Sequence, residues 1–147
     1  MVNNQDLYAP KGGSSHEGSK PRSHETILIV DDDDYCRKMV YEILSTQGYH
    51  LLMASHGEEA LKICEQKKID LLFTDVVMPK LDGVSLAEKL QKFMPELKVI
   101  FTSGYSVDRA RQRMGSDIHF IEKPYQTIEL IQKVDQVLHP RSNKSMT

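Results

Sequence analysis

From about residue 26 onward, the sequence alternates between short apolar runs and longer segments in which apolar residues recur at helical spacing. The first run, Ile27-Leu28-Ile29-Val30, is apolar throughout and rich in β-branched residues, which is typical of a strand buried on both faces. Comparable runs predict strands at 27–30, 49–53, 71–74, 99–102 and 118–121. A first helix is predicted from an apolar stripe that runs from Cys36 through Leu44, and Gly48 closes it. Further helices are predicted at 58–67, 84–93, 107–114 and 127–138.

Five buried strands alternating with five helices predict a parallel sheet that is covered by helices on both faces. The predicted fold class is therefore α/β, a doubly wound five-stranded parallel sheet, and we assign residues 26–139 to it. Residues 1–25 are rich in Gly, Ser, Lys, His and Asn and contain few apolar side chains, so we expect a flexible N-terminal tail. Residues 140–147 are polar and too few for another domain, so we expect a C-terminal tail.

The composition limits the classes of protein to be considered. The chain has 147 residues, of which 39% are hydrophobic and 27% charged, as expected for one globular domain. A net charge of -2 gives no sign of a nucleic-acid or membrane surface, and no apolar run approaches the roughly 20 residues of a membrane helix. The N-terminus lacks the pattern of a signal peptide, so a cytoplasmic protein is expected. Two cysteines form no disulfide framework, and we interpret Cys36 and Cys64 as buried, reduced thiols.

Chemically reactive side chains follow several of the predicted strands. The first strand is followed by the acidic run 31–34, the third by Asp75, and the fifth by Lys123-Pro124, while Thr102 ends the fourth. Ligands of such sheets bind at the carboxyl ends of the strands, near the point where the strand order reverses. The sequence therefore gathers carboxylates, a hydroxyl and an ammonium group at one edge of the sheet.

The acidic run predicts a metal site. Asp33 or Asp34 is expected to cap the following helix, but Asp31 and Asp32 continue directly from a buried strand. Carboxylates that converge with Asp75 would repel one another, and a hard divalent cation such as Mg²⁺ resolves the repulsion. The run is no EF-hand, because the glycine required at the sixth loop position is missing.

Asp75 is the candidate nucleophile, since a carboxylate can accept a phosphoryl group. Phosphoryl transfer requires alignment, a metal ion and cations that hold the developing charge. The hydroxyl of Thr102 can bind a phosphoryl oxygen, and Lys123 can pair with Asp75 before the transfer and with the phosphoryl group afterwards. The sequence leaves open whether the Lys123–Pro124 peptide bond is cis.

Together these residues resemble a known family, the receiver domains of two-component response regulators. The resemblance covers about residues 25–138, and its motifs are weak one by one but highly specific as an ordered set. They are Ile-Leu-Ile-Val-Asp-Asp at 27–32, Asp-Val-Val-Met-Pro at 75–79 with Asp-Gly at 82–83, Thr-Ser-Gly at 102–104, and Lys-Pro at 123–124. The resemblance implies a flavodoxin-like (βα)5 receiver fold, like that of chemotaxis receivers.

The resemblance also implies a role for each matching residue at the metal. Asp32 would contact Mg²⁺ directly, and Asp31 would act largely through water. Asp75 would be both the phosphoacceptor and a metal ligand, and the backbone carbonyl of Val77 would complete the protein's share of the coordination.

Three further residues match positions that respond to the phosphoryl group in this family. Thr102 and Lys123 would form the pair that senses it. Phe120 occupies the position of the switch aromatic, whose ring rotates as Thr102 moves. A buried strand phenylalanine is the alternative for Phe120, and the sequence leaves both interpretations open.

The implied function is that of a signalling switch. Asp75 would accept a phosphoryl group from a histidine kinase or a histidine phosphotransfer protein, and a downstream protein would bind the face of the fourth helix, fifth strand and fifth helix. The chain would catalyse only its own phosphorylation and dephosphorylation, with no direct contact to nucleic acid and no membrane insertion. We expect a single-domain response regulator, because no DNA-binding domain follows Leu138, while a receiver cut from a hybrid histidine kinase stays an alternative. The oligomeric state is left open between a monomer and a phosphorylation-dependent dimer.

Two other interpretations compete with this one, a phosphatase and a degenerate receiver that signals without phosphate. The degenerate receiver is disfavoured because all the key side chains are present. A phosphatase of the haloacid dehalogenase type also forms an aspartyl phosphate, and Asp31-x-Asp33 after the first strand imitates its motif. That interpretation leaves the Asp75 motif unexplained, and no segment resembles a cap domain.

The basic residues Arg109, Arg111 and Arg113 mark either a partner surface or a solvated helix face.

Overall fold

A computed structural model of the protein describes residues 24–103, 107–115 and 118–140. Within these ranges the chain forms five strands and five helices in strict alternation. The strands are β1 (Thr26–Val30), β2 (His50–Ala54), β3 (Leu71–Asp75), β4 (Lys98–Ser103) and β5 (His119–Glu122). The helices are α2 (Asp34–Ser45), α3 (Gly57–Gln66), α4 (Gly83–Phe93), α5 (Val107–Met114) and α6 (Thr127–Leu138). Each predicted element is present. Of the tails predicted at 1–25 and 140–147, residues 1–23 and 141–147 lie outside the described residues.

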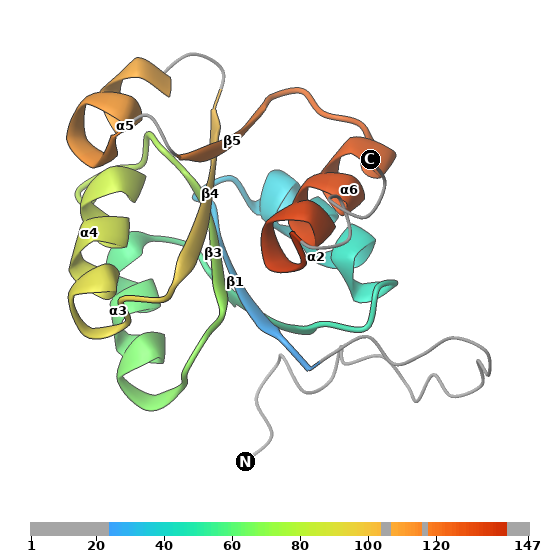
Figure 1. The fold of residues 1–147 in the computed structure, drawn as a ribbon, viewed down its shortest axis with the longest axis horizontal. Helices are drawn as coiled ribbons and strands as arrows, with labels where there is room; N and C mark the ends of the chain where they lie inside the picture. Colours follow the sequence, from blue (N-terminus) through green and yellow to red (C-terminus); the bar gives the residue numbers. More distant parts are fainter. Residues whose placement is uncertain (1–23, 104–106, 116–117, 141–147) are drawn as a thin grey trace.

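The five strands form one parallel sheet in the order β2-β1-β3-β4-β5. Helices α2 and α6 cover one face of the sheet, and α3, α4 and α5 cover the other (Figure 1). The predicted α/β, doubly wound fold is confirmed. Because β2 and β3 flank β1 on opposite sides, the strand order reverses next to β1, which makes the carboxyl ends of β1 and β3 the expected binding edge.

The sheet separates two apolar cores. One core packs beneath α3, α4 and α5 and includes Leu28, Leu72 and Phe101. The other packs beneath α2 and α6 and includes Ile27 and Phe73. Alternate residues of one strand enter opposite cores, so a strand needs apolar side chains at every position, and this accounts for the continuous runs in the sequence.

Two aspartates fix the helices that start next to the binding edge. The carboxylate of Asp33 accepts a hydrogen bond from the backbone N–H of Cys36 at 3.0 Å and caps α2, as predicted for Asp33 or Asp34. This backbone hydrogen bond lowers the pKa of Asp33. Asp82 caps α4 by accepting from the N–H of Ser85 at 2.7 Å. Both capping aspartates have extended backbone conformations themselves.

At the opposite end of the sheet, ion pairs join the start of the domain to its last helix. Glu25 lies just before β1, in the segment that the sequence analysis assigned to the N-terminal tail. Its backbone carbonyl accepts a hydrogen bond from the N–H of His50. The Nε2 atom of His139 lies 2.8 Å from a carboxylate oxygen of Glu25, and its Nδ1 atom lies 2.9 Å from one of Asp135. Burial opposes the charge on His139, but the two carboxylates outweigh it and raise the pKa of the imidazole.

Substituting glutamine for His139 is expected to destabilise the protein more at pH 6 than at pH 9. A raised folded-state pKa adds stability that is fully present below the unfolded-state pKa and is lost as the pH rises through the folded-state pKa. Because these groups are partly exposed, we expect the pH-dependent part to be about 0.5–1 kcal/mol in the free energy of unfolding, measured by urea denaturation. An equal loss of stability at both pH values would show that the imidazole is not charged in this contact.

Candidate functional site

The topology brings the predicted site residues to one edge of the sheet. Asp31 follows β1 directly, and Asp75 is the last residue of the adjacent β3. Thr102 on β4 lies opposite Asp75 in the parallel register. Lys123 follows β5 and reaches back across the ends of the strands to β1 and β3. The site is therefore assembled from four neighbouring strands of the same sheet.

Three carboxylates converge at this edge. One oxygen each from Asp31, Asp32 and Asp75 lies within 4.8 Å of the other two. Asp31 is buried, Asp32 is exposed and Asp75 is partly exposed, so the cluster opens to solvent on the side of Asp32. Three carboxylate oxygens with access to water fit a hard divalent cation that keeps part of its hydration shell.

Asp31 is fixed in place by contacts on both its backbone and its side chain. One carboxylate oxygen accepts from the N–H of Asp33 at 2.9 Å, and the backbone carbonyl accepts from the guanidinium of Arg37 at 2.7 Å. Burial raises the pKa of Asp31, although the hydrogen bond from Asp33 and the charge of Lys123 act in the opposite direction. A buried carboxylate of this kind needs a nearby cation.

Lys123 supplies that cation. Its Nζ atom lies 3.1 Å from Oδ2 of Asp75 and 3.4 Å from Oδ2 of Asp31. Burial is the largest single influence on the ammonium and opposes its charge, but the two carboxylates together outweigh it and raise the pKa of Lys123. The question left open by the sequence is answered, because the Lys123–Pro124 peptide bond is cis.

Thr102 contributes a hydroxyl group that lacks a partner. The residue is fully buried, and its Oγ1 atom makes no hydrogen bond with any residue that the structure describes. A buried hydroxyl without a partner is unfavourable unless a further group binds there. Its position opposite Asp75 makes an oxygen atom attached to Asp75 a suitable partner.

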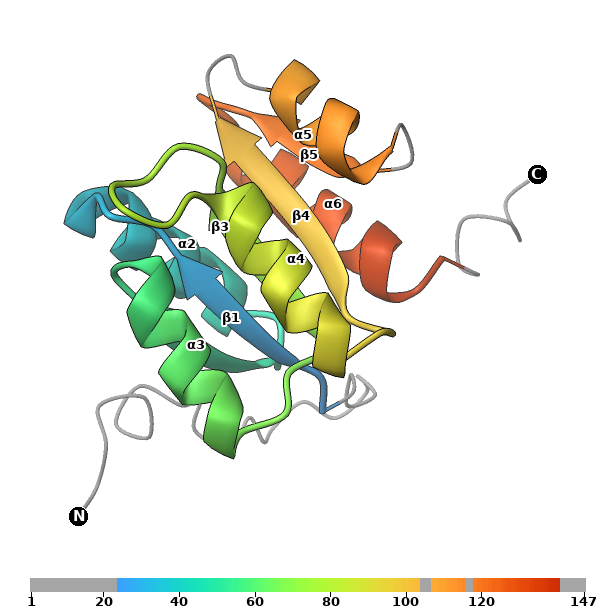
Figure 2. The same cartoon turned by 90° about the vertical axis from the view of Figure 1, so that its left-hand side faces the viewer.

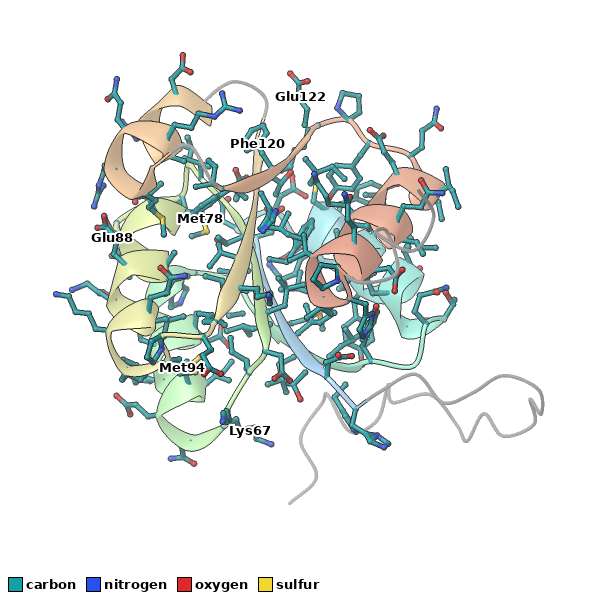
Figure 3. The ribbon with its side chains drawn as sticks, in the orientation of Figure 1. Lys67, Met78, Glu88, Met94, Phe120 and Glu122 are labelled. Carbon is teal, nitrogen blue, oxygen red and sulfur yellow. The ribbon has the colours of Figure 1, made fainter. Side chains whose placement is uncertain are left out.

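Val77 and Phe120 lie near the site but have no contact that defines a role. Val77 is two residues beyond Asp75, in the loop that leads to α4, and its side chain is exposed. Phe120 lies on β5 opposite Phe101 and packs against the core beneath α3, α4 and α5 (Figure 3). Its ring is partly buried, which fits both the switch position and a packed strand residue.

Two residues shape the site in ways that the sequence analysis did not predict: Arg37 was not singled out, and Gly83 was noted only as part of the Asp-Gly motif at 82–83. Arg37 lies four residues after the cap of α2, a spacing that returns its side chain to the preceding loop, where it binds the Asp31 carbonyl. Gly83 begins α4 directly against the backbone of Asp75, where a Cβ atom would lie 2.0 Å from the Asp75 carbonyl oxygen. A glycine immediately after a capping aspartate was the available signal for Gly83.

Comparison with known proteins agrees with this arrangement. The family model of the response regulator receiver domain matches residues 27–135. The chain belongs to this family. Receiver domains are signalling modules that interact with histidine kinases and downstream effectors, and the phosphatase alternative is not favoured by this membership.

Relatives carry this receiver domain in different architectures. The chain is 36% identical over 117 residues to the sensor kinase CckA of Brucella abortus, covering 77% of this chain and 12% of that protein. It is 28% identical over 114 residues to the response regulator receiver protein CpdR of the same organism, covering 76% and 95%. A CheY-like receiver domain structure from Methanospirillum hungatei matches with a TM-score of 0.73 and 30% identity, over 83% of this chain and 99% of that one. The helices in the described parts of this receiver include none long and apolar enough to span a membrane.

Proposed function

We propose that this receiver accepts a phosphoryl group on Asp75 in a Mg²⁺-dependent reaction. The observation that carries the proposal is the position of Lys123, whose ammonium group lies between the carboxylates of Asp75 and Asp31. A lysine in this position neutralises an acidic site before the reaction and offers a cation for new negative charge after it. Family membership supports the same interpretation.

In the proposed reaction, a carboxylate oxygen of Asp75 attacks the phosphorus atom of a phosphohistidine. A new O–P bond forms, the P–N bond of the donor breaks, and its electron pair returns to the imidazole. The donor would be a histidine kinase or a histidine phosphotransfer protein. Asp31, Asp32 and Asp75, with the backbone carbonyl of Val77, would hold Mg²⁺, which when bound neutralises charge on the phosphoryl oxygens.

The protein's own groups would act on the phosphoryl oxygens. Lys123 exchanges its contact with the Asp75 carboxylate for one with a phosphoryl oxygen, so that its charge stays paired throughout the reaction. The hydroxyl of Thr102 donates a hydrogen bond to another phosphoryl oxygen and so gains the partner that it lacks. Neither group has to transfer a proton, because the attacking oxygen is already a carboxylate oxygen.

The output would be a shift in the population of two conformations of the face formed by α5, β5 and α6. In this proposal Thr102 moves toward the phosphoryl group, and the ring of Phe120 on β5 changes its orientation as space opens behind Thr102. A downstream protein would bind one of the two conformations more tightly. The similarity to CpdR, a response regulator receiver protein that the chain matches over 95% of its length, supports a single-domain regulator. This regulator would act in the cytoplasm, be modified by its own reaction and convert no external substrate.

The dependence on the metal tests this proposal. With acetyl phosphate as a small phosphodonor and Mg²⁺ present, the wild-type chain is expected to gain one phosphoryl group by intact-mass spectrometry. Excess EDTA should prevent the gain, because the carboxylates of Asp32 and Asp75 would then repel the incoming phosphoryl oxygens. The Asp32→Asn variant should require a higher Mg²⁺ concentration for the same gain. A mass gain that is unchanged by EDTA would contradict the role assigned to the acidic cluster.

A further inference from the structure

Helices α4 and α5 lie next to each other on the face of the domain that α2 and α6 do not cover (Figure 2). A groove between them is lined by residues of both helices. It has a volume of about 640 Å³, and its lining includes Lys89, Lys92, Arg113 and Met114. The groove is open to solvent, so a bound segment would lie along it and would not be enclosed by it. We propose that this groove binds an acidic, amphipathic segment of a partner protein.

Arg113 forms one wall of the groove and its charge is already paired. Its guanidinium lies 2.5 Å from a carboxylate oxygen of Glu88 and 3.2 Å from the hydroxyl of Ser85, both on α4. A carboxylate oxygen of Asp82, the cap of α4, lies 3.9 Å away. Figure 3 shows Glu88 on α4, on the side of the domain where α5 lies. These contacts hold α5 against α4 and neutralise the acidic side chain that lines the groove.

Two lysines on α4 leave the groove with an excess of positive charge. Lys89 and Lys92 line it and are exposed. Across the described part of the chain, no carboxylate lies within ion-pair distance of either ammonium group. Because Glu88 is paired with Arg113, the two lysine charges are available to a ligand, and complementary charge requires carboxylates on the bound segment.

Apolar surface lies next to the two lysines. Phe93 is 55% exposed at the end of α4, four residues after Lys89 on the same ridge of the helix, and it lines a neighbouring hollow just beyond the groove. Met114 lies in the lining and packs partly on the core. Exposed aromatic side chains beside a groove are favoured anchors of protein interfaces. A partner segment therefore needs apolar side chains on one face and carboxylates on the other, which describes an amphipathic acidic helix.

The charge of the rest of the chain argues against a segment of this protein as the occupant. Residues 1–23 and 141–147 together contain more basic than acidic side chains. The basic ones are Lys11, Lys20, Arg22, Arg141 and Lys144, and the acidic ones are Asp6 and Glu17. Lys89 and Lys92 would repel these two basic segments, so neither of them fits the groove, and we assign the occupant to an acidic segment of a partner. The groove shares α5 with the α5, β5 and α6 face but is lined mainly by α4, which that face does not include.

A fluorescein-labelled synthetic peptide with glutamates on one helical face and leucines on the other tests the proposal with the full 147-residue chain and no phosphodonor. Fluorescence anisotropy should detect saturable binding, and a counterpart with lysine in place of each glutamate should not bind. Chemical-shift changes in ¹H–¹⁵N NMR spectra should concentrate on α4 and α5. Absence of binding, equal binding of the basic counterpart, or shift changes centred on other elements would overturn the proposal.

Matched variants distinguish binding at the groove from non-specific electrostatic attraction to the protein surface. Lys89→Glu combined with Lys92→Glu should weaken peptide binding by about tenfold or more, since two ion pairs become two repulsions. Lys38→Glu combined with Lys62→Glu makes the same change in net charge on the exposed surfaces of α2 and α3 and should leave the affinity within about twofold. Equal weakening by both pairs would overturn the proposal.

The apolar part of the proposal has its own control. Phe93→Ala should weaken binding of the acidic peptide severalfold. Ile128→Ala removes a side chain of α6 that is exposed to the same extent, 55%, and should have no effect. If the two substitutions act alike, the ridge of α4 is not the anchor and the proposal fails.

Discussion

Replacing Lys123 with methionine is expected to slow phosphoryl transfer from acetyl phosphate to Asp75 by about a hundredfold to a thousandfold. Methionine keeps an unbranched side chain of similar length but removes the cation that lies 3.1 Å from Asp75. The negative charge of the transferring phosphoryl group then develops beside Asp31 and Asp75 without a neighbouring ammonium group. The rate is measured from the time course of the mass gain in saturating Mg²⁺.

The same substitution should raise the affinity for Mg²⁺, although it slows phosphoryl transfer. Removing a positive charge next to three converging carboxylates strengthens their attraction for a divalent cation. A Mg²⁺ titration followed by NMR should therefore show tighter binding in Lys123→Met together with slower transfer. Lys62→Met, an exposed lysine on α3, is the control and should change neither quantity. An unchanged transfer rate in Lys123→Met would contradict the role assigned to the ammonium group.

Substituting alanine for Gly83 is expected to lower the free energy of unfolding by about 2–3 kcal/mol. The new Cβ atom would lie 2.0 Å from the carbonyl oxygen and 3.0 Å from the carbonyl carbon of Asp75. Both are backbone atoms, so the clash cannot be relieved by rotating a side chain and must displace the loop between β3 and α4. Because Asp75 moves with this loop, the variant should also accept phosphate more slowly under conditions where it is fully folded.

Gly57→Ala is the matched control for this substitution. Gly57 is also the first residue of its helix, but its neighbours are side-chain atoms of the partly exposed Leu81: Cδ2 at 2.7 Å, and Cβ and Cγ at 3.0 Å. A shift of Leu81 can relieve most of this clash, so we expect a loss of about 1 kcal/mol or less and a normal rate of phosphorylation. Urea denaturation compares the two variants. Equal losses of stability would show that contact with the Asp75 backbone is not what makes Gly83 necessary.

Much of the fold could be predicted because strands that are buried on both faces have apolar residues at every position, and such continuous runs are recognisable in the sequence. The exact first and last residues of the strands and helices could not all be predicted. Asp75 belongs to β3 because its backbone pairs with that of Thr102, and Lys98 belongs to β4 because its backbone pairs with that of Leu71. Both side chains are polar, so neither residue was part of an apolar run. The first helix ends at Ser45, and the chain turns over residues 46–48, where Gly48 has a positive φ of 87° and closes the helix as predicted.

The candidate site could be predicted to the extent that sheet topology decides it. Parallel strands in this order bring Asp31, Asp75 and Lys123 to one edge of the sheet, independently of the conformation of the loops. The geometry of the loops could not be predicted, since it depends on contacts between residues far apart in the sequence. The contact of Gly83 with the Asp75 backbone and the missing partner of the Thr102 hydroxyl became visible only in three dimensions.

The most direct test of the central claim is to locate the phosphoryl group in the chain. Sodium borohydride reduces an acyl phosphate to the alcohol and leaves free carboxylates intact, so a phosphorylated aspartate is converted to homoserine. After treatment with acetyl phosphate, Mg²⁺ and borohydride, peptide mass spectrometry should find homoserine at position 75 alone, and Asp75→Asn should yield none. Homoserine at position 31 or 33, or an undiminished mass gain in Asp75→Asn, would contradict the assignment of Asp75 as the phosphoacceptor.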